Sequence, residues 1–311
     1  MKRRRASLPA GAAAYVFEEA TRRREAEDRI VAGLRNAGYH EAIVPSADYL
    51  APYLPHLSAR EERELYRFVD RHGDSLALRA DFTIALARHL APRLAADGSA
   101  ARVFYRGEVL RGASRDGSST EFYQVGAELL GDASSDADAE IVERCLEALG
   151  AAARGPAHVV LSAVGALEQM LGPELTGGAA RDLAAAIRER RLPDTAEAAG
   201  RISPAFAARV RRLLEGDLPA DEPRLLSLGA AGTTLSRVAR GLSGRAGCEA
   251  AIDVAEPAPR SYYTGFFFSV YGESGGEPVA GGGRYDALYA AFGSPRPAVG
   301  FALGLEGVVG T

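Results

Sequence analysis

Two alternating segments each place a pair of polar side chains on one face of an expected strand. Arg106 and Glu108 form the first pair, and Gln124 and Glu128 form the second, with apolar residues at most of the positions between. Residues two apart in a strand point the same way. The two pairs therefore predict a sheet with one face lining a polar pocket. For either strand alone, a face exposed to solvent is an equally good interpretation.

A third element adds Asp81 and Thr83, where the expected strand 76–80 runs into a helix that continues through Ala95. Their carboxylate and hydroxyl groups suit a polar ligand. Asp81 also stands where a helix N-cap is expected, and capping alone would explain it. Taken without its neighbours, Asp81 is better interpreted as a cap than as a ligand-binding residue.

Lysine and histidine usage excludes several kinds of chemistry. Lys2 is the only lysine of the chain, whereas a phosphate-binding loop of the Walker A type, a kinase site and a Schiff-base enzyme each need a positioned lysine. There is no G-x-S-x-G nucleophile motif. The histidines are scattered and have no companion cysteines, so no metal site is expected: His40, His56, His72, His89 and His158.

Composition bounds the remaining possibilities. The chain has 311 residues, is 47% hydrophobic and carries a formal net charge of −4, so it can bury a large core and lacks the basic character of a nucleic-acid-binding domain. Cys145 and Cys248 form no recognisable disulfide pattern, which fits a reducing cytoplasm. The basic start Met1–Arg5 is interpreted as a frayed tail, and no membrane segment is expected.

The remaining pattern is a mixture of helices and short strands. A serine- and glycine-rich loop is expected at 112–120, and the glycine run Gly281–Gly283 is expected to form a tight turn before a helix that starts at 284–286. Helices are expected at 15–37 and 136–149, the second capped by Asp136. Strands are expected at 42–45, 102–110, 121–130, 158–161, 248–254 and 261–271, and an all-helical insertion at about 167–242.

Three motifs near the end of the chain resemble those of histidyl-tRNA synthetases: Tyr262–Gly265, Gly281–Asp286 and Pro297–Glu306. The resemblance runs from about Leu8 to Val309. It implies an α+β fold, a class II aminoacyl-tRNA synthetase-like antiparallel sheet flanked by helices. The domain would span 8–311, interrupted by the helical insertion, and no anticodon-binding domain would follow it.

The chain departs from the synthetase pattern at two arginines. Gly307 stands where motif 3 has the arginine that holds the ATP phosphates, and a glycine offers no charge. When this chain is aligned with the family motif on the paired tyrosines, the catalytic arginine of the family falls at Ala258. Arg260 lies two residues further on. A displacement on the order of 6 Å along a strand would remove most of its electrostatic effect. We therefore expect no adenylate formation and no catalytic residues.

These features together resemble the family of ATP phosphoribosyltransferase regulatory subunits. The resemblance implies a non-catalytic protein that binds the short-form catalytic subunit, assembles as a homodimer within a hetero-oligomer, and mediates feedback inhibition by L-histidine without a cofactor. The implied histidine site has Asp81, Thr83 and Gln124 at the ammonium group, Glu128 and Tyr263 at the imidazole, and Arg106 at the carboxylate, and it also includes Tyr262. Two alternatives remain open: a divergent or truncated histidyl-tRNA synthetase, and a stand-alone amino-acid-binding or amino-acid-modifying paralogue.

Overall fold

The structure is a computed structural model that describes residues 8, 11–94, 100–112, 120–152, 157–172, 183, 185–187, 189, 191–214, 218–272 and 276–309. The basic start at 1–5, the centre of the 112–120 loop and parts of the 167–242 segment lie outside the described residues.

A large mixed sheet forms the centre of the molecule. Its eight described strands follow the order β1-β5-β6-β11-β10-β9-β7-β8, and all neighbours are antiparallel except β1 with β5 and β7 with β8. The strands are β1 (His40–Glu41), β5 (Ala101–Leu110), β6 (Glu121–Leu130), β7 (Ala157–Ala163), β8 (Cys248–Ile252), β9 (Phe266–Gly272), β10 (Ala280–Arg284) and β11 (Ala298–Gly304). A small sheet contains β2 (Ala47–Tyr49), β4 (Ser75–Leu78) and β3 (Arg67–Val69).

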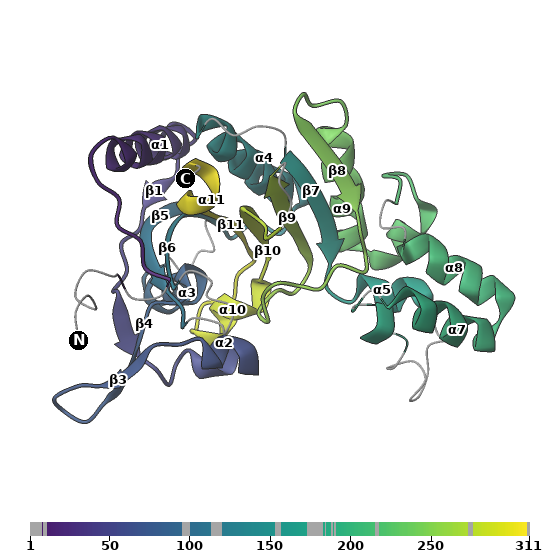
Figure 1. Cartoon of the computed structure of the whole chain (residues 1–311), viewed down its shortest axis with the longest axis horizontal. Coiled ribbons are helices and arrows are strands. Elements are labelled where there is room, and N and C mark those ends of the chain that lie inside the picture. The colour runs from purple at the N-terminus through teal and green to yellow at the C-terminus, as the bar shows by residue number, and fades with distance from the viewer. Residues whose placement is uncertain are drawn as a thin grey trace, which may run out of the picture.

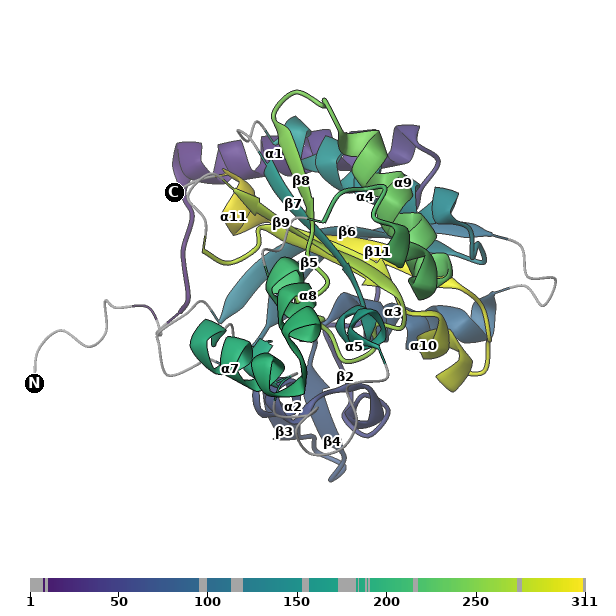
Figure 2. The ribbon, with the colours of Figure 1, turned by 90° about the vertical axis from the view of Figure 1, so that its right-hand side faces the viewer.

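Helices cover the large sheet, which confirms the α+β class. Along one side lie α1 (Phe17–Asn36), α4 (Ser135–Ala151) and α9 (Ala230–Leu242), while α3 (Phe82–Leu90) and α10 (Asp286–Ala291) lie on the other (Figures 1 and 2). The helices α5 (Ala166–Leu171), α7 (Leu192–Ile202) and α8 (Pro204–Leu214) extend to one end of the sheet (Figure 1). The remaining helical elements are η1 (Leu54–His56), α2 (Ala59–Arg63), η2 (Ala91–Arg93), η3 (Pro223–Leu228) and α11 (Leu305–Val309).

The elements named between β7 and β8 are all helical, and α9 among them packs on α4, β7 and β8. Leu235 and Val238 of α9 belong to the main core cluster. In the part of the chain that the structure describes, no helix is both long and apolar enough to cross a membrane.

The glycine run predicted as a turn is part of a central strand, so that prediction was wrong. Gly281, Gly282 and Gly283 lie in β10 between β9 and β11. A Cβ atom on Gly282 would stand 2.8 Å from the Phe268 ring and closer still to the carbonyl oxygen of Gly300. Glycine is needed here because neighbouring groups occupy the space of a side chain.

Three local predictions also need correction. Residues 42–45 follow β1 as irregular chain, because the pairing with β5 ends at Glu41. The cap of α4 is Ser134, whose hydroxyl accepts from the Ala137 N–H at 3.3 Å, in place of Asp136. Tyr262 and Tyr263 precede β9 in a turn rather than lying within a strand. The predicted strands at 102–110 and 121–130 are confirmed.

We predict that Gly282→Ala destabilises the fold by about 2 to 4 kcal/mol, because its methyl group would force the packed backbones of β9, β10 and β11 apart. Gly241→Ala is the matched control, since an added Cβ there meets nothing within 4 Å and lies in helix α9. Alanine is favoured over glycine in a helix. Urea denaturation compares the two variants; equal stability would contradict the packing argument.

Candidate functional site

The register between β5 and β6 places the two predicted polar pairs on opposite faces of the sheet. Arg106 is directly opposite Val125, whereas Gln124 is directly opposite Gly107. Opposed residues of antiparallel strands point to the same side. Gln124 and Glu128 therefore lie on the face away from α1, and Arg106 lies on the face that α1 covers. The prediction of one shared polar surface was wrong by one residue of register.

Arg106 forms part of an ion-pair network under α1 and is not available to a ligand on the pocket face. Its Nη1 is 2.9 Å from Glu27 Oε1, and its Nε is 2.9 Å from Glu41 Oε1. Burial lowers the pKa of Arg106, but these two carboxylates outweigh burial and raise it overall. Tyr123 also donates its hydroxyl to Glu27 Oε1 at 2.7 Å. The predicted role of Arg106 at a ligand carboxylate is therefore withdrawn.

The face opposite α1 carries a pocket of about 390 Å³. Five of the predicted site residues line it: Asp81, Thr83, Gln124, Tyr262 and Tyr263. The capping interpretation of Asp81 is confirmed, since its Oδ1 accepts from the Ile84 N–H at 3.0 Å as the cap of α3. The Tyr262 hydroxyl donates to its other oxygen at 3.0 Å. One carboxylate thus anchors α3 and the Tyr262 turn at the pocket.

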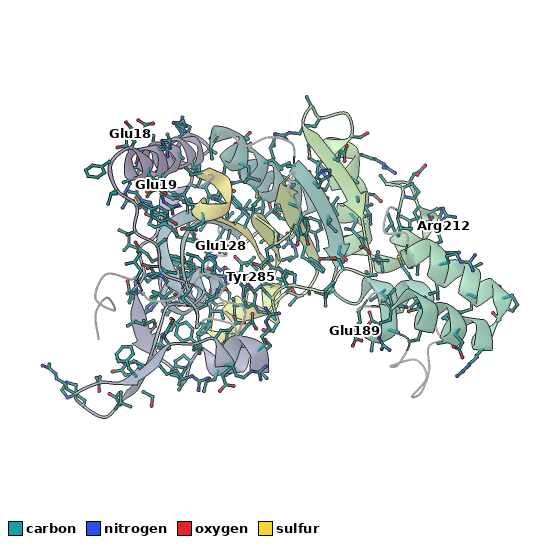
Figure 3. All side chains as sticks on the ribbon, viewed as in Figure 1. Glu18, Glu19, Glu128, Glu189, Arg212 and Tyr285 are labelled. Carbon is teal, nitrogen blue, oxygen red and sulfur yellow. The ribbon has the colours of Figure 1, made fainter. Side chains whose placement is uncertain are left out.

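Glu128 lies behind the pocket wall, although the sequence predicted direct contact with a ligand. Its side chain is 1% exposed. The hydroxyl of Thr83 donates to its Oε1 at 3.0 Å, and the hydroxyl of Tyr285 donates to its Oε2. Figure 3 shows Glu128 and Tyr285 close together at the centre of the molecule. Burial raises the pKa of Glu128 to about 8, against the two hydroxyl hydrogen bonds that lower it.

Arg111 is the pocket residue that the sequence analysis missed. Its Nε donates to the Ala80 carbonyl at 3.0 Å, while its Nη2 is buried without a hydrogen-bond partner among the described residues. Burial, and secondarily the neighbouring Arg260, lower the pKa of Arg111 to about 10. The sequence did contain a signal for Arg111. With a period of two residues, Arg111 points to the same side as Tyr105 and Val109, which is the pocket side of the sheet. A buried N–H group without a partner needs an acceptor, and an anion supplies the strongest one.

Arg260 brings a second guanidinium to the same pocket. Its Nη1 is 3.4 Å from Glu61 Oε1, and its Nε is 3.8 Å from Asp81 Oδ2. Burial lowers the pKa of Arg260, but Tyr262, Asp81 and other acidic neighbours outweigh burial and raise it. Both arginines are therefore charged near neutral pH, and an anionic group between them would relieve their mutual repulsion.

Glu277, Glu306 and Gly307 also line the pocket. Gly307 lies against Val279, whose Cγ1 would be 3.1 Å from a Cβ added to Gly307. Glu306 accepts from Arg23 Nη2 at 2.6 Å and from the Tyr123 N–H at 3.1 Å. Arg23 therefore balances the charge of Glu306, and Gly307 supplies no cation for a phosphate. The described residues contain no cluster of His, Cys, Asp or Glu suited to a metal ion.

Fold and site together define a class II synthetase-like protein with a pocket of about 390 Å³, lined by both charged and apolar side chains. The family model for histidyl-tRNA synthetase matches residues 11–308. Curated relatives described as ATP phosphoribosyltransferase regulatory subunits share 35% identity in Moorella thermoacetica, over 96% of this chain and 80% of that protein, and 30% in Geobacillus kaustophilus, over 88% and 72%. The chain belongs to this family of regulatory subunits, within the histidyl-tRNA synthetase-like proteins.

Solved structures agree on the fold. A regulatory subunit/histidyl-tRNA synthetase from Bacillus halodurans has a TM-score of 0.84 at 24% identity, over 99% of this chain and 83% of that one. A histidine–tRNA ligase subunit from Alicyclobacillus acidocaldarius has a TM-score of 0.75 at 30% identity, over 98% and 96%. The ATP phosphoribosyl transferase (HisG:HisZ) complex from Thermotoga maritima matches at a TM-score of 0.71 and 21% identity, over 93% and 99%.

We predict that Glu128→Gln changes the pH dependence of stability. A carboxyl group whose pKa is about 8 in the folded protein, against 4.5 for an unperturbed glutamate, binds more protons when folded, so wild-type stability falls as pH rises from about 5 to 8. The variant lacks this titration, and its stability relative to wild type should rise over that interval by on the order of 4 kcal/mol at most. Urea unfolding at pH 5, 6, 7 and 8 measures the difference.

Glu62→Gln is the control for that experiment, because Glu62 is a surface carboxylate paired with Arg67 at 3.1 Å. It should leave the pH profile of wild type unchanged. A constant stability difference between Glu128→Gln and wild type across the four pH values would contradict the raised pKa.

Proposed function

We propose that this chain is the non-catalytic regulatory subunit of an ATP phosphoribosyltransferase, and that it binds the short-form catalytic subunit and conveys feedback inhibition by L-histidine. Family membership supports the partnership. The main support for an amino-acid ligand is that Arg111 Nη2 is buried in the pocket wall and has no hydrogen-bond partner in the described part of the chain. A free amino acid supplies the anion that this group lacks.

The pocket offers complementary groups for each end of histidine. Arg111 and Arg260 would receive the carboxylate, and Asp81 and Gln124 the ammonium group. Thr83 and Tyr285 both donate their hydroxyl protons to Glu128 and line the pocket, so toward a ligand their oxygen atoms would act as hydrogen-bond acceptors. We propose that Glu128 acts through these hydroxyls, while Tyr262 and Tyr263 pack beside the imidazole.

The assembly and location follow from the same proposal. We infer a homodimer bound to catalytic subunits in the cytoplasm, and the two free cysteines, Cys145 and Cys248, are consistent with that compartment. We also retain one domain over 8–311, interrupted by the helical segment 167–242. The helical character of the described elements between β7 and β8 supports this division.

A second candidate is a histidyl-tRNA synthetase activity, which the 30% identity to the Alicyclobacillus acidocaldarius ligase subunit favours. Gly307 counts against it, since adenylate formation requires cations at the phosphates and a glycine supplies none. An assay of histidine-dependent ATP–pyrophosphate exchange separates the two candidates. Exchange above background would favour the synthetase.

We predict that the purified chain activates phosphoribosyl-ATP formation by the short catalytic subunit, that histidine inhibits the complex, and that Arg111→Gln weakens the inhibition about 10- to 100-fold. Loss of one charge-assisted hydrogen bond corresponds to about 1.5 to 3 kcal/mol. The measurement is the concentration of histidine that halves the rate.

Arg106→Gln is the control for this prediction, because Arg106 lies on the opposite face of the sheet. It should leave histidine sensitivity close to that of wild type. If Arg106→Gln abolished inhibition and Arg111→Gln preserved it, histidine would not bind in the pocket as proposed.

A further inference from the structure

Arg260 is held loosely by carboxylates of this chain. Its distances of 3.4 Å to Glu61 and 3.8 Å to Asp81 exceed the roughly 2.7 to 2.9 Å of a strong charge-assisted hydrogen bond. The Arg260 side chain retains 24% exposure and lines the pocket. A carboxylate arriving in the pocket could make a shorter contact than Arg260 has now. Arg260 is therefore a guanidinium whose partner can be exchanged.

Glu61 is in contrast a fixed group. It completes the capping box of α2, in which its Oε2 accepts from the Ser58 N–H at 2.8 Å and the Ser58 hydroxyl accepts from the Glu61 N–H at 3.3 Å. The Ser261 hydroxyl also donates to Oε2 at 3.0 Å. Glu61 Oε2 is thus occupied by two donors, and its Oε1 is the atom nearest Arg260.

Charge is retained on Glu61 despite its position. Burial raises the pKa of Glu61, but hydrogen bonds from Ser58 and then the charge of Arg260 outweigh it and lower the pKa overall. Glu61 is not one of the residues that line the pocket. Its carboxylate therefore stands beside Arg260 without lining the pocket.

We propose that Glu61 is a specificity-determining residue that competes with the carboxylate of the ligand for Arg260. The inference rests on the proposed amino-acid ligand. In the empty pocket Glu61 balances the charge of Arg260, and a bound carboxylate takes over part of that role. Glu61 thereby reduces the difference in affinity between an amino acid and the same molecule without a carboxylate. The reason is that the new ion pair with Arg260 forms at the expense of the existing one.

The same contact connects the pocket to a surface helix. Arg111, the other pocket guanidinium, forms a β-bridge with Leu65, and the Gly112 N–H donates to the Glu64 carbonyl at 2.5 Å. Both arginines are thus attached to α2 or to the residues that follow it. When a ligand draws Arg260 away from Glu61, amide hydrogen exchange over 59–65 should change in wild type and not in Arg260→Gln.

The test is calorimetric titration of the full chain with L-histidine and with L-histidinol, which lacks the carboxylate. Glu61→Gln keeps an oxygen for the capping box and removes the charge. The ratio of histidine affinity to histidinol affinity should rise about threefold to tenfold in Glu61→Gln, as expected for release of one partly exposed ion pair. Glu62→Gln, whose carboxylate pairs with Arg67 on the surface, should change the ratio less than twofold.

A ratio that is unchanged or lower in Glu61→Gln overturns the proposal, because Glu61 would then be neutral or helpful to carboxylate binding. If the variant fails to fold, Glu61→Asp keeps the charge but withdraws it by one methylene, and the ratio should again rise. In an Arg260→Gln background, Glu61→Gln should have no further effect on the ratio. Absence of histidine binding to wild type would instead refute the proposed ligand itself.

Discussion

The pocket depends on the close packing of β6, β10 and β11, which leaves room for one buried carboxyl group. A Cβ atom on Gly300 would overlap the carboxylate of Glu128, and one on Gly282 would overlap the neighbouring strand. Only glycines allow the strands to approach while Glu128 stays beneath them. The hydroxyls of Thr83 and Tyr285 are then held by Glu128, which fixes the wall that faces the ligand.

The two faces of the large sheet carry different arrangements of charged side chains. Under α1, Arg106 and Glu27 neutralise each other within a network that includes Tyr123. On the pocket face, Arg111 and Arg260 stand without an equally close anion among the described groups. The first arrangement joins a helix to the sheet, whereas the second leaves positive potential for a ligand. Arg106 in β5 and Arg111 directly after β5 therefore have different surroundings because they point in opposite directions.

The sequence predicted the elements better than the side-chain directions. Strand periodicity located β5 and β6 closely, because alternation is a local property of each strand. Register is a relation between strands, and the observed register places Arg106 on the face of the sheet away from the pocket, while Arg111 lines the pocket. The Gly281–Gly283 run was assigned to a turn because glycine permits turns. The atoms that demand glycine there are side-chain and backbone atoms of β9 and backbone atoms of β11, and only the folded arrangement brings them together.

The central claim is that the pocket face binds histidine through Arg111. A crystal structure of the chain with L-histidine tests it most directly. The account predicts one ligand in the pocket of each chain, with its carboxylate within hydrogen-bonding distance of Arg111 Nη2, roughly 2.7 to 3.2 Å. Histidine bound at a contact between subunits, with the pocket empty, would contradict the account.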